Sequence, residues 1–518
     1  MLKSARVCGF AILFLAGLPA HADNVLLRHV QLYDGSGNPP VGADVRIAGE
    51  RIAAIGATLE PLPGETVRDL HGLALAPGFI DMHSHADRGL LEDLDAATQT
   101  RQGITTTVVG QDGESNFPLH GWLAKLDATP PALNVASMVG QATLREQVMG
   151  KDLYRPSSDQ ELVKMKALLS QELAAGGFGL STGLEYEQAH FSTTAEVVEL
   201  SKVAAAAHGF YISHVRDEAD HVFESFDEVL TIGREAKLPV EITHIKLGST
   251  GVWNLAAKRV PHYFEAARRD HVTLWADVYP YTYWHSTIRV IVPDRDFFNA
   301  KKVERALADN GGAGAIRLAH YAPQPQLNGK TLEQIAQLWQ VSPVEAYMRI
   351  VKATEAEVNS DQQLEDIIAT SMTDADVKWF IAQPEIAFCT DGELHGAHPR
   401  GAGSFPRVLG HYVREEHVVS LSNAIHRMTD VPAQRLKLAD RGRVAPGYVA
   451  DLVIFDPATV IDQSTIDHPE APPLGIPAVM VSGTFVIDDG KPTGRHPGKA
   501  LRAKPIKAVS IVRASEDR

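Results

Sequence analysis

The sequence predicts a TIM-like (β/α)8 barrel with a small β-sandwich domain built from both chain ends. The central part of the chain alternates eight short apolar runs with helical stretches, as the βα units of a closed parallel barrel do. Both ends instead carry short strand-like runs broken by turn residues. One connection between two of the eight runs is too long for a single crossover, which indicates an insertion. An open doubly wound sheet is the alternative for the central part, and the number of units favours the barrel.

The first 22 residues are typical of a secretory signal peptide. Lys3 and Arg6 precede an apolar run over 7–18, and Ala20-His-Ala resembles a cleavage site. An uncleaved anchor is the alternative, but a membrane-spanning helix needs about 20 apolar residues. We therefore expect a periplasmic or secreted protein without a stable membrane anchor after cleavage. Only Cys389 would remain, which excludes an intrachain disulfide.

The two ends of the mature chain are expected to share one domain. Residues 23–76 contain short strand-like runs separated by the turn-rich segment 34–40, and residues 440–505 contain matching runs over 450–455 and 478–486. The N-terminal strands cannot close a core alone, so we expect both ends to pair into one β-sandwich. Residues 506–518 are left as a C-terminal tail.

The barrel is expected over residues 77–439. Its candidate strands are residues 79–85, 104–109, 134–139, 178–181, 210–214, 240–245, 273–278 and 386–390. Helical stretches lie between most of them, for example over 194–208 and 222–236. The segment between the seventh and eighth runs is far longer than one crossover, so an inserted subdomain is expected near 286–345.

The composition excludes several classes of partner. The chain has 518 residues with 44% hydrophobic and 22% charged residues, which supports a sizeable core. Its 49 Lys and Arg against 64 Asp and Glu give a formal net charge of −15, and no basic face for nucleic acid is indicated. The sequence does not indicate an oligomeric state.

The first candidate strand carries a potential metal site. Alternate residues on a strand face the same way, so His83 and His85 project together from its C-terminal end, with Asp81 one step deeper. Two neighbouring imidazoles can bind one divalent cation, and a carboxylate below them can orient a ring by accepting its other N–H. Two ordinary surface histidines are the alternative.

Three further polar residues end apolar runs of the predicted barrel. His214 ends the fifth candidate strand, His244 the sixth, and Asp391 the eighth. In a barrel these strand ends meet at one rim, where active sites are built. Four histidines and one aspartate at one rim favour a metal site over separate structural residues.

These residues and their flanking motifs resemble the D-aminoacylase (N-acyl-D-amino-acid deacylase) family of the metal-dependent amidohydrolase superfamily. The resemblance runs from about residue 24 to about residue 500. The motifs are Ser181-Thr-Gly-Leu-Glu-Tyr, Ser213-His-Val-Arg-Asp-Glu, Thr243-His-Ile-Lys, Asp277-Val-Tyr-Pro-Tyr, His398-Pro-Arg and the segment 440–452. It implies a metal-dependent hydrolase that releases the acyl group from N-acyl-D-amino acids, with one or two Zn²⁺ ions.

One position departs from the family pattern. Similar deacylases carry a cysteine ligand after strand two, where this chain has Asp112 in Gly110-Gln-Asp-Gly. A carboxylate is a harder ligand than a thiolate and can bridge two cations, so Mn²⁺ or Co²⁺ is also expected to be tolerated. The alternative is that Asp112 only caps a turn. Residues 178–183 contain no lysine that could be carboxylated as a bridge, and Glu185 is a weaker bridging candidate.

The chemistry that follows is amide hydrolysis by an activated water. Asp391 is expected to take the proton of the water and deliver it to the leaving nitrogen. Lys246 lies on the same face as His244 and matches a family position that contacts the substrate carboxylate. The other predicted substrate-binding residues are Tyr281, Arg216, Arg289 and Tyr186. Arg400 is expected to form a structural ion pair.

Other functions remain open at this stage. A cyclic-amide hydrolase of the dihydroorotase or hydantoinase type, or a dipeptidase, could use the same ligands, because the loops of the pocket decide the substrate. A non-catalytic periplasmic binding protein is a more remote alternative, since all five rim positions are filled. The basic candidate residues suit a small anionic amide as the substrate, such as an N-acyl amino acid.

Overall fold

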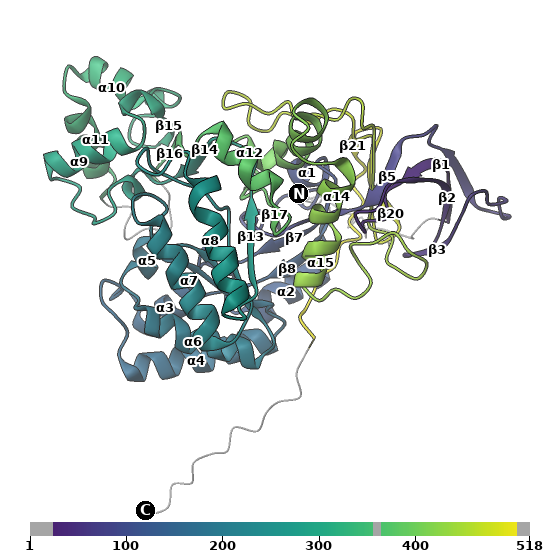
Figure 1. The fold of residues 1–518 in the computed structure, drawn as a ribbon, viewed down its shortest axis with the longest axis horizontal. Coiled ribbons are helices and arrows are strands. Elements are labelled where there is room, and N and C mark those ends of the chain that lie inside the picture. Colours follow the sequence, from purple (N-terminus) through teal and green to yellow (C-terminus); the bar gives the residue numbers. More distant parts are fainter. Residues whose placement is uncertain (1–23, 356–363, 505–518) are drawn as a thin grey trace, which may run out of the picture.

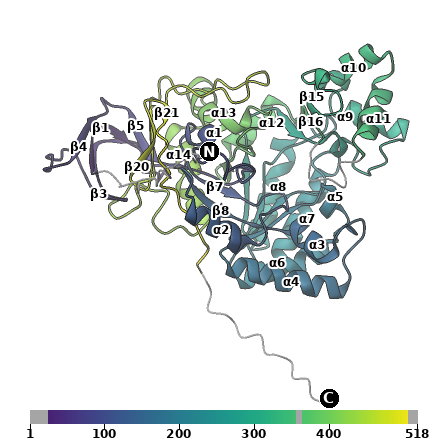
Figure 2. The same ribbon diagram turned by 180° about the vertical axis from the view of Figure 1, so that it is seen from behind.

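The computed structural model describes residues 24–355 and 364–504. The expected signal peptide over 1–22 and the tail over 506–518 lie outside the described residues. The chain forms a central barrel, with a β domain at one end of the molecule and an inserted subdomain at the other (Figures 1 and 2). Within the described part of the chain, no helix has the length and apolar character needed to cross a membrane.

The eight predicted strands form the barrel, and all of them run parallel. They are β6 (Phe79–Asp81), β7 (Ile104–Val109), β8 (Asn134–Ser137) with its continuation β9 (Val139–Gly140), β10 (Gly179–Gly183), β11 (Phe210–His214), β12 (Val240–Ile242), β13 (Leu274–Val278) and β17 (Ile386–Phe388). The barrel prediction is therefore confirmed.

Helices surround these strands (Figure 1). They are α1 (Ala97–Thr100), α2 (Leu119–Ala128), α3 (Gln141–Met149), α4 (Asp159–Ala174), α5 (Glu187–His190), α6 (Thr194–Ala206), α7 (Val222–Ala236), α8 (Ala256–Arg269), α12 (Asp374–Ala382), α13 (Arg400–Arg407), α14 (Leu421–Met428) and α15 (Asp430–Arg435). Helix α7 shows why they pack: Val222, Phe226 and Val229 are buried at a spacing that makes one apolar stripe. Ser158 begins α4 with a capping box that it shares with Glu161.

The barrel closes between its first and last strands. Ser84 and Gly392 form a parallel bridge, and the His85 N–H donates to the Gly392 carbonyl at 2.9 Å. The Asp391 N–H donates to the His83 carbonyl at 2.8 Å. The closure therefore holds the ends of β6 and β17 side by side.

The β domain unites the two ends of the chain, as the sequence predicts. Its nine strands are β1 (Val25–Leu32), β2 (Val41–Ala48), β3 (Arg51–Gly56), β4 (Thr66–Asp69), β5 (Ala74–Pro77), β18 (Leu452–Phe455), β19 (Ala478–Val481), β20 (Thr484–Asp488) and β21 (Lys491–Pro492). They belong to one continuous sheet, in which β5 lies between β1 and β18. Residues 498–503, which we expected in this domain, instead pair with the barrel, because Val135 of β8 exchanges backbone hydrogen bonds with Lys499 and Leu501.

The inserted subdomain is longer than the expected 286–345. It begins at β14 (Tyr283–Ser286) and ends at β16 (Glu365–Thr370). Between them lie a 3-10 helix (Ile288–Ile291), α9 (Ala300–Asp309), β15 (Ile316–Tyr321), α10 (Leu332–Trp339) and α11 (Pro343–Ala353). The boundary was missed because β16 pairs antiparallel with both β14 and β15, so the far end of the insertion is set by a long-range pairing. The subdomain has a hydrophobic core of its own.

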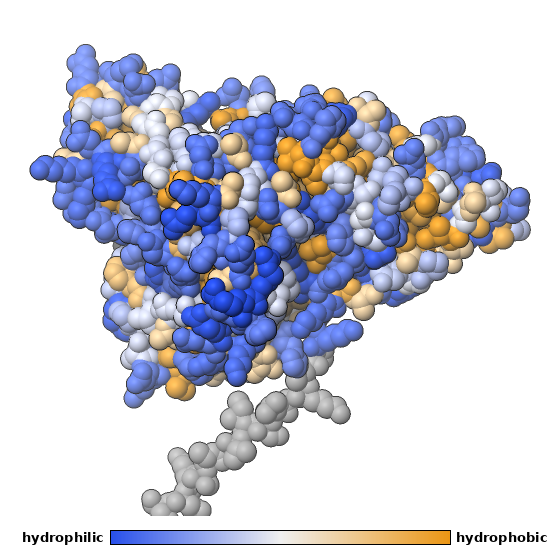
Figure 3. Space-filling model, viewed as in Figure 1, coloured by the Kyte–Doolittle hydropathy of each residue, from blue (hydrophilic) through white to orange (hydrophobic). Residues whose placement is uncertain are grey.

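The surface is mainly hydrophilic on the face shown in Figure 3, with separate hydrophobic patches. A buried ion pair joins two barrel helices. The Arg145 guanidinium in α3 is fully buried and donates to both oxygens of Glu196 in α6, at 2.9 and 2.8 Å. The same guanidinium also donates to the carbonyls of Gln188, Leu153 and Arg155.

Arg145→Met is expected to lower the apparent free energy of unfolding by about 3–5 kcal/mol, because it removes the cation that neutralises the buried Glu196 carboxylate. Urea denaturation followed by circular dichroism measures this loss. Arg268→Met is the matched control, since the Arg268 pair with Glu385 is exposed and worth at most about 1 kcal/mol. Equal losses in the two variants would contradict the structural role of Arg145.

Candidate metal centre

Barrel closure places three predicted site residues together. His83 and His85 follow β6, and Asp391 follows β17. The Nε2 atoms of His83 and His85 lie 3.3 and 3.4 Å from Asp391 Oδ1. The backbone hydrogen bonds that close the barrel thus fix one carboxylate against two imidazoles.

Asp112 enters the same cluster from the loop after β7. Its Oδ1 lies 3.4 Å from His83 Nε2 and its Oδ2 lies 3.1 Å from His85 Nε2. The loop can approach because Gly183 has no side chain, and a Cβ there would lie 2.2 Å from the Asp112 carbonyl oxygen. Asp112 is buried and points into the cluster, which disfavours the interpretation of a simple turn cap.

His214 and His244 complete the set from the ends of β11 and β12. His244 Nε2 lies 3.5 Å from Asp112 Oδ1 and 3.1 Å from His214 Nδ1. The other ring nitrogen of His214 lies 2.8 Å from Glu185 Oε2. All four predicted histidines and both aspartates therefore meet at one end of the barrel.

Two overlapping groups of these residues can each hold a divalent ion. Within each group, every residue offers one ligand atom, and these atoms lie within 4.8 Å of one another. The first group consists of His83, Asp112, His244 and Asp391, and the second of His214, Glu218 and His244. His244 belongs to both, so the chain offers two adjacent positions that share one imidazole.

The arrangement fits a cation better than a network of hydrogen bonds. His83 Nε2 and Asp112 Oδ1 are buried and have no hydrogen-bond partner among the described residues, although they face each other. Buried polar atoms are rarely left in this state. A tetrahedral ion with bonds of about 2.1 Å separates its ligand atoms by about 3.4 Å, close to the spacings observed here.

The charges of the cluster depend strongly on one another. Burial disfavours the ionised carboxylates, but His83, His244 and His85 hold the pKa of Asp112 well below its usual value. Burial likewise opposes ionisation of Asp391, and Arg400 and His244 keep its pKa well below the ordinary range. The pKa of His83 is raised well above its usual value, because Asp112 and Asp391 outweigh its burial.

The backbone at this site is strained. Asp112, His244 and Asp391 have φ values of 55°, 35° and 49°, in the left-handed region. Such conformations cost about 1–3 kcal/mol each in non-glycine residues and cluster at functional sites. The surrounding structure therefore holds these three side chains in place at a cost to stability.

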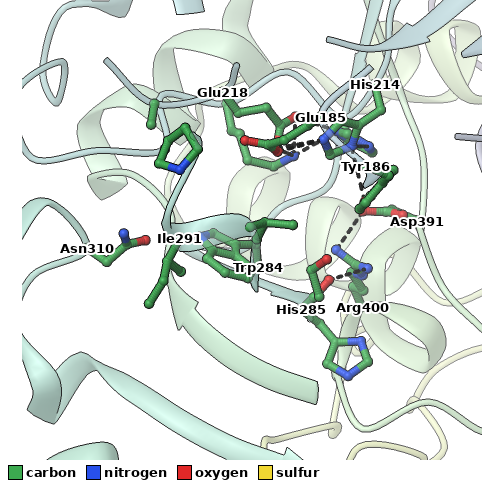
Figure 4. Close-up of a pocket in the computed structure, with 17 residues that line it drawn as sticks. Glu185, Tyr186, His214, Glu218, Trp284, His285, Ile291, Asn310, Asp391 and Arg400 are labelled. Carbon is green, nitrogen blue, oxygen red and sulfur yellow. Dashed lines mark hydrogen bonds and ion pairs between the residues drawn. The ribbon is translucent and has the colours of Figure 1, made fainter. Parts of the chain in front are cut away.

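A pocket opens beside the cluster, between the barrel rim and the inserted subdomain (Figure 4). Tyr186, His214 and Asp391 line it from the barrel, and Trp284 and His285 line it from the insertion. Tyr186 lies against His214, with its hydroxyl 3.3 Å from the Nδ1 atom. A small molecule in this pocket therefore reaches the cluster directly.

Two cations in the pocket have carboxylate partners. Lys246 Nζ donates to both oxygens of Glu218, at 2.7 and 2.8 Å, and lies 2.7 Å from His244 Nδ1. The Arg400 guanidinium lies 2.6 Å from Asp391 Oδ2. The expected ion pair of Arg400 is thus made with the candidate base itself.

Two predicted substrate contacts, Arg216 and Arg289, lie outside the metal-centre pocket. Arg216 forms a bidentate pair with Glu228 and also donates to the His190 carbonyl. Arg289 lies in the insertion, where it donates to Val351 and Thr354. Both guanidiniums contact structural partners and neither lines the metal-centre pocket, so the structure does not support a substrate contact for them there.

Tyr281 and Asp81 also differ from the prediction. The Tyr281 hydroxyl points away from the cluster toward Asp462 and Ser464, at 3.3 and 3.5 Å. Asp81 accepts hydrogen bonds from the Thr390 N–H at 2.9 Å and from the Thr390 hydroxyl at 2.5 Å, so it supports the closing strand instead of orienting an imidazole. The His83 ring contacts the Thr243 hydroxyl instead.

Glu218 is the main residue that sequence reasoning missed. It joins His214, His244 and Lys246, yet it follows β11 in a segment without regular structure. The quoted motif Ser213-His-Val-Arg-Asp-Glu contains it, and a spacing of four residues from His214 was the available signal.

Comparison with known proteins identifies the family of this chain. Residues 66–487 match the Amidohydrolase family. The chain belongs to the amidohydrolase family. This amidohydrolase is 35% identical over 503 residues to a D-aminoacylase from Alcaligenes xylosoxydans xylosoxydans, which covers 92% of this chain and 97% of the relative. The resemblance stated from the sequence is therefore confirmed.

Two solved structures share the complete fold of this amidohydrolase. An N-acyl-D-glutamate deacylase from Bordetella bronchiseptica, complexed with zinc and a phosphonate inhibitor, gives a TM-score of 0.82 at 32% identity over 93% of this chain and 100% of that chain. A D-aminoacylase structure concerned with its binuclear metal centre gives 0.81 at 33% identity with the same coverage. The protein is a metal-dependent hydrolase of carbon–nitrogen bonds.

Proposed function

We propose that this amidohydrolase uses zinc to release the acyl group from N-acyl-D-amino acids. The observation that carries the proposal is the convergence of His83, His244, Asp112 and Asp391 at a pocket whose lining includes cations. The relatives described above are at least 32% identical to this chain over nearly its whole length. They are named for this reaction or complexed with zinc.

The donor set suits one or two ions. We propose His83, His85, Asp112, His244 and Asp391 as ligands of one position, and His214, Glu218 and His244 as ligands of a second. Asp112 supplies a carboxylate where similar deacylases have a cysteine thiolate. A carboxylate favours harder cations, so the site is expected to accept Mn²⁺ or Co²⁺ as well as Zn²⁺. A divalent cation held by these residues would lower the pKa of a bound water to about 7 and would polarise the amide carbonyl.

Asp391 is proposed to move the proton. Its Oδ2 is held by Arg400, which leaves Oδ1 facing the histidines as the acceptor. The low pKa of Asp391 keeps this oxygen ionised before the reaction. Oδ1 then passes the proton to the leaving nitrogen, which departs as a neutral amine.

Lys246 is proposed to bind the substrate carboxylate. It lies in the pocket beside His244, and Glu218 holds its ammonium in place while raising its pKa, so it remains charged. Tyr186 is proposed to close the other side of the pocket through its contact with His214.

Lys246→Met is expected to raise KM by about 10–100-fold, because a charge-assisted hydrogen bond to the substrate is lost. The effect on kcat is expected to be smaller, and steady-state kinetics separates the two constants. Lys302→Met is the matched control, since Lys302 lies on α9 and pairs with Asp294 and Asp296. An unchanged KM would remove Lys246 from substrate binding.

A substrate panel tests the proposed function. N-acetyl-D-amino acids are expected to be hydrolysed. Their L-enantiomers, dipeptides, hydantoins and dihydroorotate are assayed separately as substrates of the alternative enzyme classes. Turnover of only the cyclic amides or only the dipeptides would contradict the proposal. Absence of any turnover by the metal-loaded protein would favour a non-catalytic binding protein.

We infer from the sequence that the chain is exported. The segment 1–22 supports a periplasmic or secreted location with no membrane anchor after cleavage. N-terminal sequencing of the protein from the periplasmic fraction should begin at Asp23. A cytoplasmic protein that retains Met1 would contradict this inference.

A further inference from the structure

A second cavity lies outside the metal-centre pocket. It measures about 250 Å³ and lies between the loop around α5 and the inserted subdomain. Arg289 and Arg295 line it from the insertion, and Glu187, His190 and Phe191 line it from the barrel side. It shares no lining residue with the metal-centre pocket.

Both arginines of this cavity lack a carboxylate partner within the described residues. Arg289 is 6% exposed, and its buried Nε atom has no hydrogen-bond partner there. Arg295 donates to two backbone carbonyls, those of Arg289 and Glu185, and its Nε atom is also buried without a partner. Burying a cation without a counter-charge costs free energy. An anion bound at this wall of the cavity would reduce that cost.

The cavity is also lined by two carboxylates. The carboxylate of Glu187 lines the cavity and accepts a hydrogen bond from the Tyr154 hydroxyl at 3.2 Å. Glu355 adds a second carboxylate. Among the described residues, neither Glu187 nor Glu355 forms an ion pair with Arg289 or Arg295. The cavity therefore presents carboxylates and guanidiniums that do not neutralise each other. A ligand with both charges would satisfy both walls.

Aromatic rings supply the rest of the lining. Phe191 and Phe297 line the interior, and Tyr154 and Phe298 stand at the surface with exposed fractions of 53% and 50%. Arg289 also lies over the Phe297 ring, 5.5 Å from its centre. Exposed rings gathered at one opening mark a binding surface for an apolar group.

We propose that this cavity binds a free α-amino acid with an apolar side chain. Its carboxylate would pair with Arg289 and Arg295, its ammonium with Glu187, and its side chain would pack against the four rings. The lining of the cavity alone supports this ligand, which does not depend on the substrate proposed above. Arg295 also donates to the Glu185 carbonyl, and the Glu185 side chain contacts His214, so the occupied cavity would adjoin the wall of the metal centre.

Calorimetric titration of the metal-loaded protein with phenylalanine of either hand tests the proposal. Saturable binding is expected to persist in Lys246→Met, which disturbs the metal-centre pocket, and to weaken about ten-fold or more in Arg289→Met. Phe298→Glu provides a second variant that does not risk the fold, because the ring is half exposed, and it should weaken binding similarly. Arg305→Met, an exposed arginine of α9, is the control and should bind as the wild type does.

The analogues 3-phenylpropanoate, which lacks the ammonium, and phenethylamine, which lacks the carboxylate, are expected to bind at least about ten-fold more weakly than phenylalanine. Equal binding of 3-phenylpropanoate would overturn the zwitterion assignment. Absence of saturable binding would overturn the site itself. Binding that is lost in Lys246→Met and kept in Arg289→Met would also overturn it, because the ligand would then occupy the metal-centre pocket.

Discussion

Asp391→Asn is expected to lower kcat by about 10²–10⁴-fold, the usual contribution of a general base and acid. The amide oxygen can still face His83 and His85, but it cannot accept the proton of the attacking water at neutral pH. The contacts that place residue 391, the hydrogen bond to the His83 carbonyl and the bridge at Gly392, are backbone contacts and are kept. Steady-state turnover of an N-acetyl-D-amino acid, measured together with metal content, checks the prediction.

The metal content separates two explanations of such a loss. Asp391 is also a candidate ligand, so activity that is lost together with the ion would show a ligand role without a proton-transfer role. Activity that is lost while the ion stays bound supports the proposed base. Asp294→Asn is the matched control, because Asp294 is an exposed carboxylate of the insertion that pairs with Lys302. Wild-type kcat in Asp391→Asn would contradict the mechanism.

His244→Ala is expected to have the largest effect on metal binding. His244 is the one residue common to the two candidate ion positions. Its loss removes a ligand from both, although Asp112 keeps His83 and His85 as neighbours and Glu218 keeps His214. We expect metal affinity to fall by at least about 100-fold, because removal of a residue that merely supports a ligand already costs 10–100-fold. Elemental analysis after gel filtration measures the bound ion.

The control for this variant is His120→Ala. His120 is an exposed histidine of α2, far in sequence from the cluster. It should leave metal content and turnover unchanged. If His244→Ala retained full metal content, the ion would be bound elsewhere, and the overlap of the two groups at His244 would have no functional meaning.

The parts of the fold that the sequence predicted are those with local signals. The alternation of apolar runs and helices is local, and it located all eight barrel strands. Residues at strand ends were placed together because parallel strands present their carboxyl ends at one rim. His83, His85, His214, His244 and Asp391 all follow this rule, and the structure brings them together.

Predictions that depended on loops were less successful. Arg216 and Arg289 were expected in the pocket on the basis of their charge, but a guanidinium is equally suited to structural acceptors, which both have found. Glu218 was missed because the segment after β11 has no regular periodicity that would set its direction. The end of the insertion escaped prediction because β16 is defined by partners far away in the sequence.

His83, Asp112, His244 and Asp391 are proposed to hold a divalent ion that is required for hydrolysis. Anomalous diffraction from crystals of the zinc-loaded protein tests it most directly, combined with turnover by the same preparation before and after chelation. We expect a zinc peak about 2.0–2.2 Å from the imidazole nitrogens and carboxylate oxygens of this group, with turnover lost on chelation and restored by zinc. A peak at other residues, or full turnover by the metal-free protein, would contradict it.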